Sequence, residues 1–360
     1  MQLKEETTSM VKNNKNNDWI KLLLDNFIWI IVVAVFAFFS FQMPERFFTL
    51  PNFVNVLLHA SVLGVLVIGQ AIVLLTGNFD LSAEGVLSLT TILAMWLMAE
   101  PRTDAGGAQA SGWMLHPFIV IPIMFMVGIL SGWIIGMFIT RLKMNGFIVT
   151  LAMQLVLRGI ALIISEGQIM TGSPALFNWL GGTRIRGFPV SVGVTLLMYL
   201  VVNYLLNQSK FGRNLRAVGA NRDAARASGF DPNKTITRAY MISGFLGAFA
   251  GWMLLGRLET SISSLGEGMT LETVAASVIG GVSLKGGLGS VGGAFAGVML
   301  LSIIDNALNL MDVDPFWVQA VRGFIILLAL LIEAQKFRYK PKVVHEKDER
   351  IAAVELESKA

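Results

Sequence analysis

Residues 207–238 read NQSKFGRNLRAVGANRDAARASGFDPNKTITR, a polar stretch that interrupts an otherwise apolar chain. It carries seven Lys and Arg against two acids. Within it, residues 221–228 favour a helix of about two turns: Asn221 is a good N-cap, Asp223 suits the first turn, and Gly229 ends the helix. A small helix on a basic loop between apolar runs predicts a docking surface for another protein.

The chain on both sides of this loop is too apolar for a soluble protein of 360 residues. It is 54% hydrophobic and 14% charged, with a mean hydropathy of +0.65. Its apolar residues form long runs that are nearly free of charge, as transmembrane helices require. We therefore predict an all-α polytopic membrane protein with about ten transmembrane helices, at 26–43, 54–76, 79–99, 118–139, 146–165, 188–206, 239–256, 272–284, 289–309 and 316–335.

The eighth predicted span, 272–284, is short. About 13 residues cover only about 20 Å of a hydrocarbon core about 30 Å thick. Three interpretations stay open: the helix is tilted, it is extended into the stretch from Thr260, or it is partly re-entrant. The transmembrane domain as a whole is predicted at 26–335, with polar tails at 1–25 and 336–360.

Lys and Arg gather on alternate loops. If the N-terminus is cytoplasmic and all ten spans cross, 21 of the 28 Lys and Arg lie inside and five lie outside, while Arg158 and Arg322 fall within spans. Because cytoplasmic loops carry the excess of positive charge, this distribution predicts that both termini are cytoplasmic. Without the eighth span the basic C-terminus would lie outside, so we count that span as crossing.

Several other classes of protein are excluded by composition. Cysteine is absent, so no disulfide, thiolate metal site or catalytic thiol is expected. The three histidines are far apart in the sequence, which argues against a metal centre. The net charge of +4 belongs to the flanks of a membrane protein and does not indicate nucleic-acid binding. The first apolar run is longer than the core of a signal peptide and reads as an uncleaved signal anchor.

Charged residues within spans are costly and therefore informative. Asp305 and Arg322 lie at nearly equal distances from a turn at 312–314, so we predict that they pair. Arg158 is placed at a similar depth. We expect it to join this polar network, together with Gln154, Asn306, Asn309 and Gln319. Two interpretations stay open: the pair fixes helix packing, or the group lines the outer part of a permeation path.

A weak internal repeat links the fifth and tenth spans. Residues 154–162 read QLVLRGIAL and residues 319–327 read QAVRGFIIL. The two spans run in opposite directions, so the halves would have inverted topology, as in many transporters. The two arginines are not placed symmetrically along their helices, which counts against the repeat.

Two glycine-containing turns separate neighbouring spans. In GNFDLSAEG (77–85), Asp80 or Ser82 is predicted to cap the next helix, with Glu84 in its first turn. The segment GGVSLKGGLGSVGG (280–293) has seven glycines but lacks the spacing of a phosphate-binding loop. We expect both segments to be tight cytoplasmic turns with small-residue packing faces; direct contact of Asp80 with a solute is the alternative.

Five segments, in order from about residue 50 to 335, together resemble the permease subunit of bacterial monosaccharide ABC importers. The likeness is to the ribose, arabinose and xylose branch, within a larger group that includes branched-chain amino-acid permeases. The segments are GNFDLSAEGVLSL, FIVTLAMQLVLRGIALIISEG, FGRNLRAVGANRDAARASGF, VIGGVSLKGGLGSVGGAFAG and DNALNLMDVDPFWVQAVRGFIILLALLIE.

This resemblance implies an ABC importer permease fold in the bacterial inner membrane. It implies a second permease chain (a homodimer), two ATPase domains bound below, and a periplasmic sugar-binding protein docked above. ATP and Mg would lie on the ATPase, so this chain is expected to hold no cofactor and to be a transport subunit rather than an enzyme. The longest outward loops, 100–117 and 166–187, are the expected docking sites for the binding protein.

The loop motif of the family, of G-x-N-x-x-A-A-x-x-x-G type, matches Gly219, Asn221, Ala224, Ala225 and Gly229. The resemblance implies that Asn221–Ser228, including Arg222 and Asp223, form the coupling helix that sits in a cleft of the ATPase. The small alanines are expected to enter that cleft.

The family's DLSVG turn matches Asp80, Leu81 and Ser82. Here Ala83 and Glu84 replace Val and Gly, which adds a negative charge. The sequence leaves the role of this charge open.

Two rival classes remain. A secondary transporter would also show ten spans and an inverted repeat, but would need an ion- or proton-binding carboxylate near the middle of the membrane. Asp305 beside Arg322 is poorly suited to that role. An intramembrane enzyme would need a catalytic set, and the sequence offers no buried His, Cys or pair of metal-binding carboxylates.

Overall fold

The computed structural model describes residues 27–99 and 112–338. The predicted tail 1–25, most of the tail 336–360 and most of the loop 100–117 lie outside these residues. The described helices are α3 (Phe27–Gln42), α4 (Leu50–Leu75), α5 (Ala83–Met98), α6 (Pro117–Thr140), α7 (Gly146–Ser165), α8 (Ala175–Gly182), α9 (Val190–Gln208), α10 (Lys210–Ala220), α11 (Arg222–Ala227), α12 (Pro232–Leu258), α13 (Met269–Ile279), α14 (Val291–Leu310) and α15 (Pro315–Arg338).

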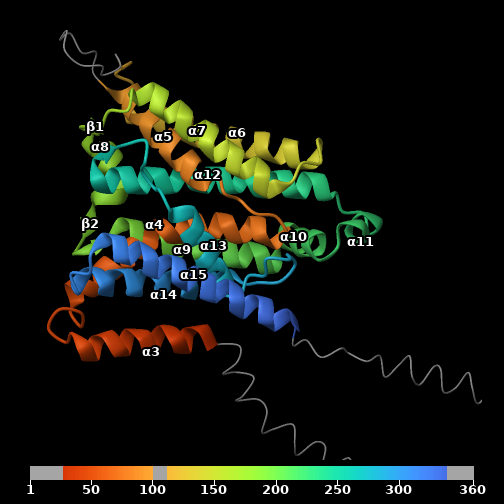
Figure 1. Ribbon diagram of the computed structural model, residues 1–360. Coiled ribbons are helices and arrows are strands. Elements are labelled where there is room, and N and C mark those ends of the chain that lie inside the picture. The colour runs from red at the N-terminus through yellow and green to blue at the C-terminus, as the bar shows by residue number, and fades with distance from the viewer. Residues whose placement is uncertain (1–26, 100–111, 339–360) are drawn as a thin grey trace, which may run out of the picture.

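Four strands of two residues each complete the described secondary structure. β1 (Met170–Thr171) pairs antiparallel with β4 (Thr260–Ser261), and β2 (Arg184–Ile185) pairs antiparallel with β3 (Phe188–Pro189). These strands and α8 lie at one end of a bundle of long helices, and α10 and α11 lie at the other end (Figure 1). We refer to these as the α8 end and the α11 end.

Six of the described helices are long and apolar enough to cross a membrane: α4, α6, α7, α9, α12 and α14. Four shorter apolar helices, at Phe27–Gln42, Ala83–Met98, Met269–Ile279 and Phe316–Leu328, fall at the other predicted spans. The prediction of a mostly helical, multi-span membrane protein is therefore confirmed. The count of ten spans stays a prediction.

The helix boundaries follow local sequence signals. Thr49 caps α4 by accepting the Asn52 N–H at 3.3 Å, and Asn145 caps α7 by accepting the Phe147 N–H at 2.9 Å. The Ser290 hydroxyl caps α14 in the same way at 3.0 Å. Each of these side chains satisfies a backbone donor that has no partner within its own helix.

Helices α4 and α12 form the centre of the bundle. In α4, 89% of the most apolar 18-residue window is buried, and in α12 the share is 67%. For α7 the share is only 22%, so most of its surface faces outward. Helix α4 packs on α13 and α14, and α12 packs on α5 and α6. Helix α3 lies at the edge of the bundle against α14 (Figure 1).

Helices α5 and α13 are short for transmembrane helices. Helix α5 has 16 residues and α13 has 11. An irregular segment precedes each of them: 76–82 is mostly buried, whereas 262–268 is half-buried or exposed and contributes Glu267 and Gly268 to the lining of a cavity. Such a backbone is tolerated at membrane depth where protein surrounds it or where it lines a water-filled cavity. The eighth predicted span is thus resolved as a short helix that, with the residues before it, connects β4 at the α8 end to the 280–290 turn.

Helices α6 and α12 approach so closely that their glycines are required. A Cβ on Gly132 would lie 2.0 Å from the Tyr240 carbonyl oxygen, and a Cβ on Gly244 would lie 2.0 Å from the Gly128 oxygen. We expect Gly132→Ala to lower the free energy of unfolding by about 2 kcal/mol, because backbone must move. The measurement is thermal unfolding in detergent. Gly193→Ala in α9, with open space at its Cβ, is the matched control and should keep the parent stability.

Candidate functional site: a coupling segment and an intramembrane polar network

The segment between α9 and α12 holds two helices where the sequence predicted one. Helix α10 was not predicted, and α12 begins at Pro232, inside the predicted loop. The prediction for α11 is confirmed: Asn221 is its N-cap, and its Oδ1 accepts the N–H groups of Asp223 and Ala224 at 2.9 and 3.0 Å. Gly229 follows the helix with φ of 83°, a conformation that favours glycine.

Six of the predicted coupling residues are exposed, on α11 or next to it: Asn221, Arg222, Asp223, Ala224, Ser228 and Gly229. Helix α11 protrudes at the end of the molecule (Figure 1). The expectation that both alanines face a partner is wrong for Ala225. That residue is 3% exposed and packs in a core cluster with Leu215 and Val218 of α10. Because α11 is so short, one of its faces packs against the rest of its own chain, and only the other faces remain exposed.

Gly219 also serves the interior of the chain. A Cβ at this position would lie 1.9 Å from the Leu75 carbonyl oxygen and 2.5 Å from the Gly287 nitrogen. The Gly287 N–H donates to that same Leu75 oxygen at 3.0 Å. The glycine of the loop motif therefore lets α10, the end of α4 and the 280–290 turn meet. The structure gives it a packing role rather than an exposed surface.

The turn 77–85, expected to be a tight turn with a small-residue packing face, is mostly buried. Asp80 is 2% exposed and Ser82 is 1% exposed. Asp80 Oδ1 accepts the Ser82 N–H and hydroxyl at 2.9 and 2.6 Å, and its Oδ2 accepts the Ser243 hydroxyl at 2.6 Å. Ser82 is the N-cap of α5 but makes no side-chain capping bond. Asp80 thus fixes the turn, and three hydrogen bonds satisfy its buried carboxylate.

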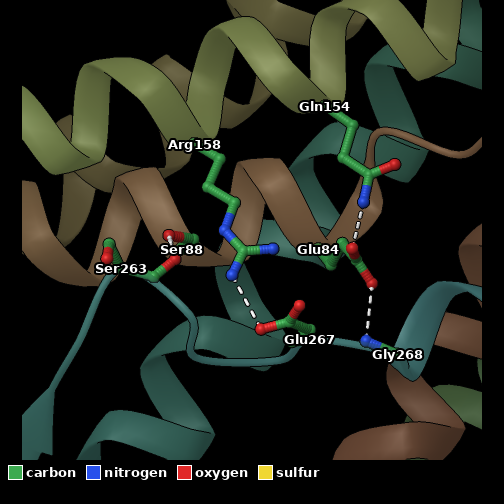
Figure 2. A network of polar contacts seen from close by, with 7 residues as sticks. All are labelled: Glu84, Ser88, Gln154, Arg158, Ser263, Glu267 and Gly268. Carbon is green, nitrogen blue, oxygen red and sulfur yellow. Dashed lines mark hydrogen bonds and ion pairs between the residues drawn. The ribbon is translucent and has the colours of Figure 1, made fainter.

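Glu84, whose role the sequence left open, joins the first turns of the two short helices. Its Oε2 accepts the N–H groups of Gly268 and Thr270 at 3.1 and 3.3 Å, at the start of α13. In return the Glu84 N–H, at the start of α5, donates to the Thr270 hydroxyl at 3.3 Å. Each helix therefore caps the other, and the carboxylate lies where the α13 dipole favours negative charge. Figure 2 shows Glu84 between α7 and Gly268.

Two polar side chains of α7 reach toward this junction (Figure 2). The Gln154 amide donates to Glu84 Oε1, and Arg158 Nη2 forms an ion pair with Glu267 Oε2 at 2.7 Å. The expectation that Arg158 and Gln154 join the Asp305–Arg322 pair is therefore wrong at the level of direct contact. The reason is that α7 packs on α5, which brings Gln154 and Arg158 next to the carboxylates of Glu84 and Glu267 and not next to Asp305.

The predicted pairing of Asp305 with Arg322 is confirmed. Arg322 Nε lies 2.8 Å from Asp305 Oδ1, and Arg322 Nη1 lies 2.8 Å from Glu272 Oε1. The side chains of Asp305 and Glu272 are 18% and 13% exposed, and that of Arg322 is 37% exposed. One guanidinium from α15 thus holds carboxylates from α14 and α13, with its fork of donors satisfying two partners.

A cavity of about 660 Å³ lies where these groups meet. Its polar lining includes Glu267, Glu272, Asn309, Gln319 and Arg322. Through Glu267 it connects the α7 ion pair to the α15 network. Of the other predicted polar residues, Asn306 does not line the cavity, and its buried Oδ1 has no hydrogen-bond partner among the described residues.

Sequence reasoning missed Glu267 and Glu272. Glu267 lies outside every predicted span, and Glu272 was taken only as the first residue of the eighth span. The sequence contains one signal for them: Glu267 and Glu272 are five residues apart, one just before a short helix and one within it. Each of them lies close to an arginine on another span. This signal can be recognised only once the helices that α13 contacts are known.

Comparisons with known proteins agree with this arrangement. The family model described as "Branched-chain amino acid transport system / permease component" matches residues 52–330. The ribose import permease protein RbsC of Haemophilus influenzae is 32% identical over 329 residues, covering 90% of this chain and 98% of the relative. RbsC of Escherichia coli K12 is 31% identical over 85% of this chain and 92% of its own length.

A second kind of sugar permease is equally similar. The L-arabinose transport system permease protein AraH of Escherichia coli K12 is 31% identical over 318 residues, 88% of this chain and 92% of the relative. No solved structure is a significant match. These relatives are membrane transport components rather than enzymes. The family model and the relatives extend over nearly all the described helices, so the chain belongs to the branched-chain amino acid transport system permease family.

Proposed function

We propose that the chain is the membrane-spanning permease subunit of an ATP-binding cassette importer that carries a monosaccharide, of the pentose or a related class. The observation that carries the proposal is the match to ribose and arabinose permeases over 85–90% of the chain. A sugar is too polar to cross lipid unaided, so its translocator must offer a path with polar groups. Selection would lie with a soluble binding protein.

The proposed ATPase contact is the exposed part of α11. Arg222, Asp223, Ala224 and Ser228 face outward on a segment rich in positive charge. The sequence has no phosphate-binding loop of its own, so hydrolysis is assigned to a partner that binds ATP and Mg. One coupling helix engages one ATPase domain, and ABC ATPases act in pairs. The complete importer would then hold two copies of this permease around a two-fold axis.

The proposed topology has ten membrane-crossing segments with both termini cytoplasmic. The α11 end carries the basic segment 207–238, which agrees with the positive-inside rule. The packing supports an inverted repeat in which α4, α5, α6 and α7 correspond to α12, α13, α14 and α15. Helix α4 contacts α13 and α14, and its counterpart α12 contacts α5 and α6. Likewise α7 packs on α5, and α15 packs on α13. In each half, a polar side chain of the last helix binds a carboxylate on the short one.

The proposed translocation path includes the cavity beside α13 and α15. Carboxylates, amides and a guanidinium line it, and these groups exchange hydrogen bonds with sugar hydroxyls readily. At the α8 end, the hairpin of β2 and β3 presents Arg184 and Arg186 to solvent. We assign loop 166–187, with loop 100–117, to docking of the binding protein.

The test is uptake by vesicles that hold the chain with the ATPase and binding protein encoded beside it. We expect uptake of labelled ribose or arabinose that requires ATP and the binding protein, and a complex mass that fits two permease copies. Full uptake without the binding protein would point to a secondary transporter. A single permease copy per complex would overturn the dimer.

A second candidate substrate is a branched-chain amino acid, because the matched family model carries that description. The same vesicles separate the two, with labelled leucine supplied beside labelled pentoses. Saturable leucine uptake with no sugar uptake would replace the proposed substrate class and leave the importer mechanism intact.

A further inference from the structure

Segment 76–84, which comprises the irregular connection 76–82 and the first two residues of α5, contacts both α11 and the junction of the short helices. At one end, Arg222 Nη2 of α11 donates to Asn78 Oδ1 at 2.9 Å. Asn78 is 7% exposed, and its amide nitrogen donates to the Thr76 hydroxyl at 2.8 Å. The amide of Asn78 thus fixes the position of the first residue of α11 against the membrane domain.

The middle of the segment is attached to α12. The Tyr240 hydroxyl donates to the Phe79 carbonyl oxygen at 2.6 Å, and the Ser243 hydroxyl donates to Asp80 Oδ2 at 2.6 Å. Four residues separate the end of α11 from the start of α12, and the two helices are in contact. Helix α11, helix α12 and segment 76–84 are therefore cross-linked at several points. A packed unit of this kind moves as a body rather than bending.

The far end of the segment holds α13. Glu84 follows the segment's buried turn and accepts two N–H groups at the start of α13, at 3.1 and 3.3 Å. It also binds Gln154 of α7. A displacement of the segment would move these acceptor oxygens away from the α13 backbone donors. Because α13 carries Leu271 and Glu272 into the polar cavity, its position sets the shape of that cavity.

We propose that segment 76–84 transmits movement of the coupling helix to the α5–α13 junction, with Asn78 and Glu84 as the positioning residues at its two ends. The inference rests on the proposed function, since the movement would be driven by an ATPase bound to α11. It assigns roles to two residues outside the predicted coupling helix. Asn78 receives the movement through Arg222, and Glu84 passes it to the helix that borders the cavity.

The test uses a single-cysteine reporter in the full complex of permease, ATPase and binding protein. The chain contains no cysteine, so Leu271→Cys gives this chain a single thiol, in the first turn of α13. The Leu271 side chain is 57% exposed. Its reaction rate with a water-soluble maleimide is measured without nucleotide and with ATP and vanadate. In the reporter chain we expect a change in rate of about fivefold or more. For each variant, the reaction rate with ATP and vanadate is divided by the rate of the same variant without nucleotide.

Asn78→Ala should abolish this response while the ATPase still co-purifies, because the buried Asn78 side chain cannot touch the ATPase. Asn78→Asp keeps the acceptor oxygen for Arg222 and should keep the response. Arg222→Met removes the same hydrogen bond from the exposed side and should abolish the response even if Asn78→Ala folds poorly; because Arg222 also belongs to the proposed ATPase contact, the result is scored in complexes where the ATPase still co-purifies. Arg213→Met is the matched control, since Arg213 is exposed and donates to the nearby Gln208 oxygen at 3.2 Å.

Three outcomes would overturn the proposal: a full response in folded Asn78→Ala, an equal loss in Asn78→Asp, or no response in the reporter chain although the ATPase is bound. Failure of the parent chain to bind any ATPase is a separate result. It would contradict the proposed function itself, before any variant is compared.

Discussion

Replacing Arg322 with alanine is expected to lower the free energy of unfolding by about 3 kcal/mol, at the lower end of the range for a broken buried pair. The substitution removes the partner of two carboxylates at once, since Asp305 and Glu272 each lie 2.8 Å from the guanidinium. We place the effect at the lower end because the Arg322 side chain is 37% exposed, so water screens part of the charge. The measurement is equilibrium unfolding in mixed micelles.

The matched control is Arg46→Ala. Arg46 faces Asp312 at 3.7 Å, with side chains 68% and 88% exposed, so the loss should stay below about 1 kcal/mol. Stability should return in a triple variant that combines Arg322→Met with Asp305→Asn and Glu272→Gln, because no buried charge is then unpaired. A charge swap of Asp305 and Arg322 should not restore stability, since Glu272 would then face a second carboxylate. If Arg322→Ala and Arg46→Ala lose equal stability, the three-residue network does not stabilise the fold.

Replacing Ala224 with aspartate is expected to lower ATPase-dependent transport by at least about tenfold, equivalent to about 1.4 kcal/mol of lost binding. Ala224 is exposed and lies in the first turn of α11, where an acid is compatible with the helix dipole. The membrane domain should therefore fold, while the larger charged side chain blocks entry into the ATPase cleft. Co-purification of the ATPase and uptake by vesicles are the two measurements.

Two further variants interpret that result. Asn233→Asp adds the same charge at an exposed position outside α11, and should leave co-purification unchanged. Ala225→Asp should instead reduce the folded yield, because it places an unpaired carboxylate at a 3% exposed core position. Normal ATPase binding and transport in Ala224→Asp would contradict the assignment of α11 as the coupling helix.

The hydrogen-bonded cap of α12 sits beside this surface. The Lys234 N–H donates to Asp231 Oδ1 at 3.1 Å and lowers the pKa of the Asp231 carboxyl below its ordinary value. The carboxylate therefore stays ionised at neutral pH and keeps its cap.

The sequence by itself determined the class of protein, most helix boundaries and the position of α11. These properties depend on local signals: long apolar runs set the spans, and Asn221 with Gly229 sets the limits of α11. The Asp305–Arg322 pair was also predictable, because both residues belong to one helical hairpin whose turn fixes their relative depth.

Only the tertiary structure decided which residues meet across the bundle. Glu84 contacts Gly268 and Thr270, which are more than 180 residues away in the sequence, and Glu272, the second partner of Arg322, lies on a separate short helix, α13. The direction in which Ala225 faces depends likewise on the packing of α10. Hydropathy and capping are properties of neighbouring residues. Which buried charge finds which partner depends on how separate helices pack, and one sequence carries no direct record of that packing.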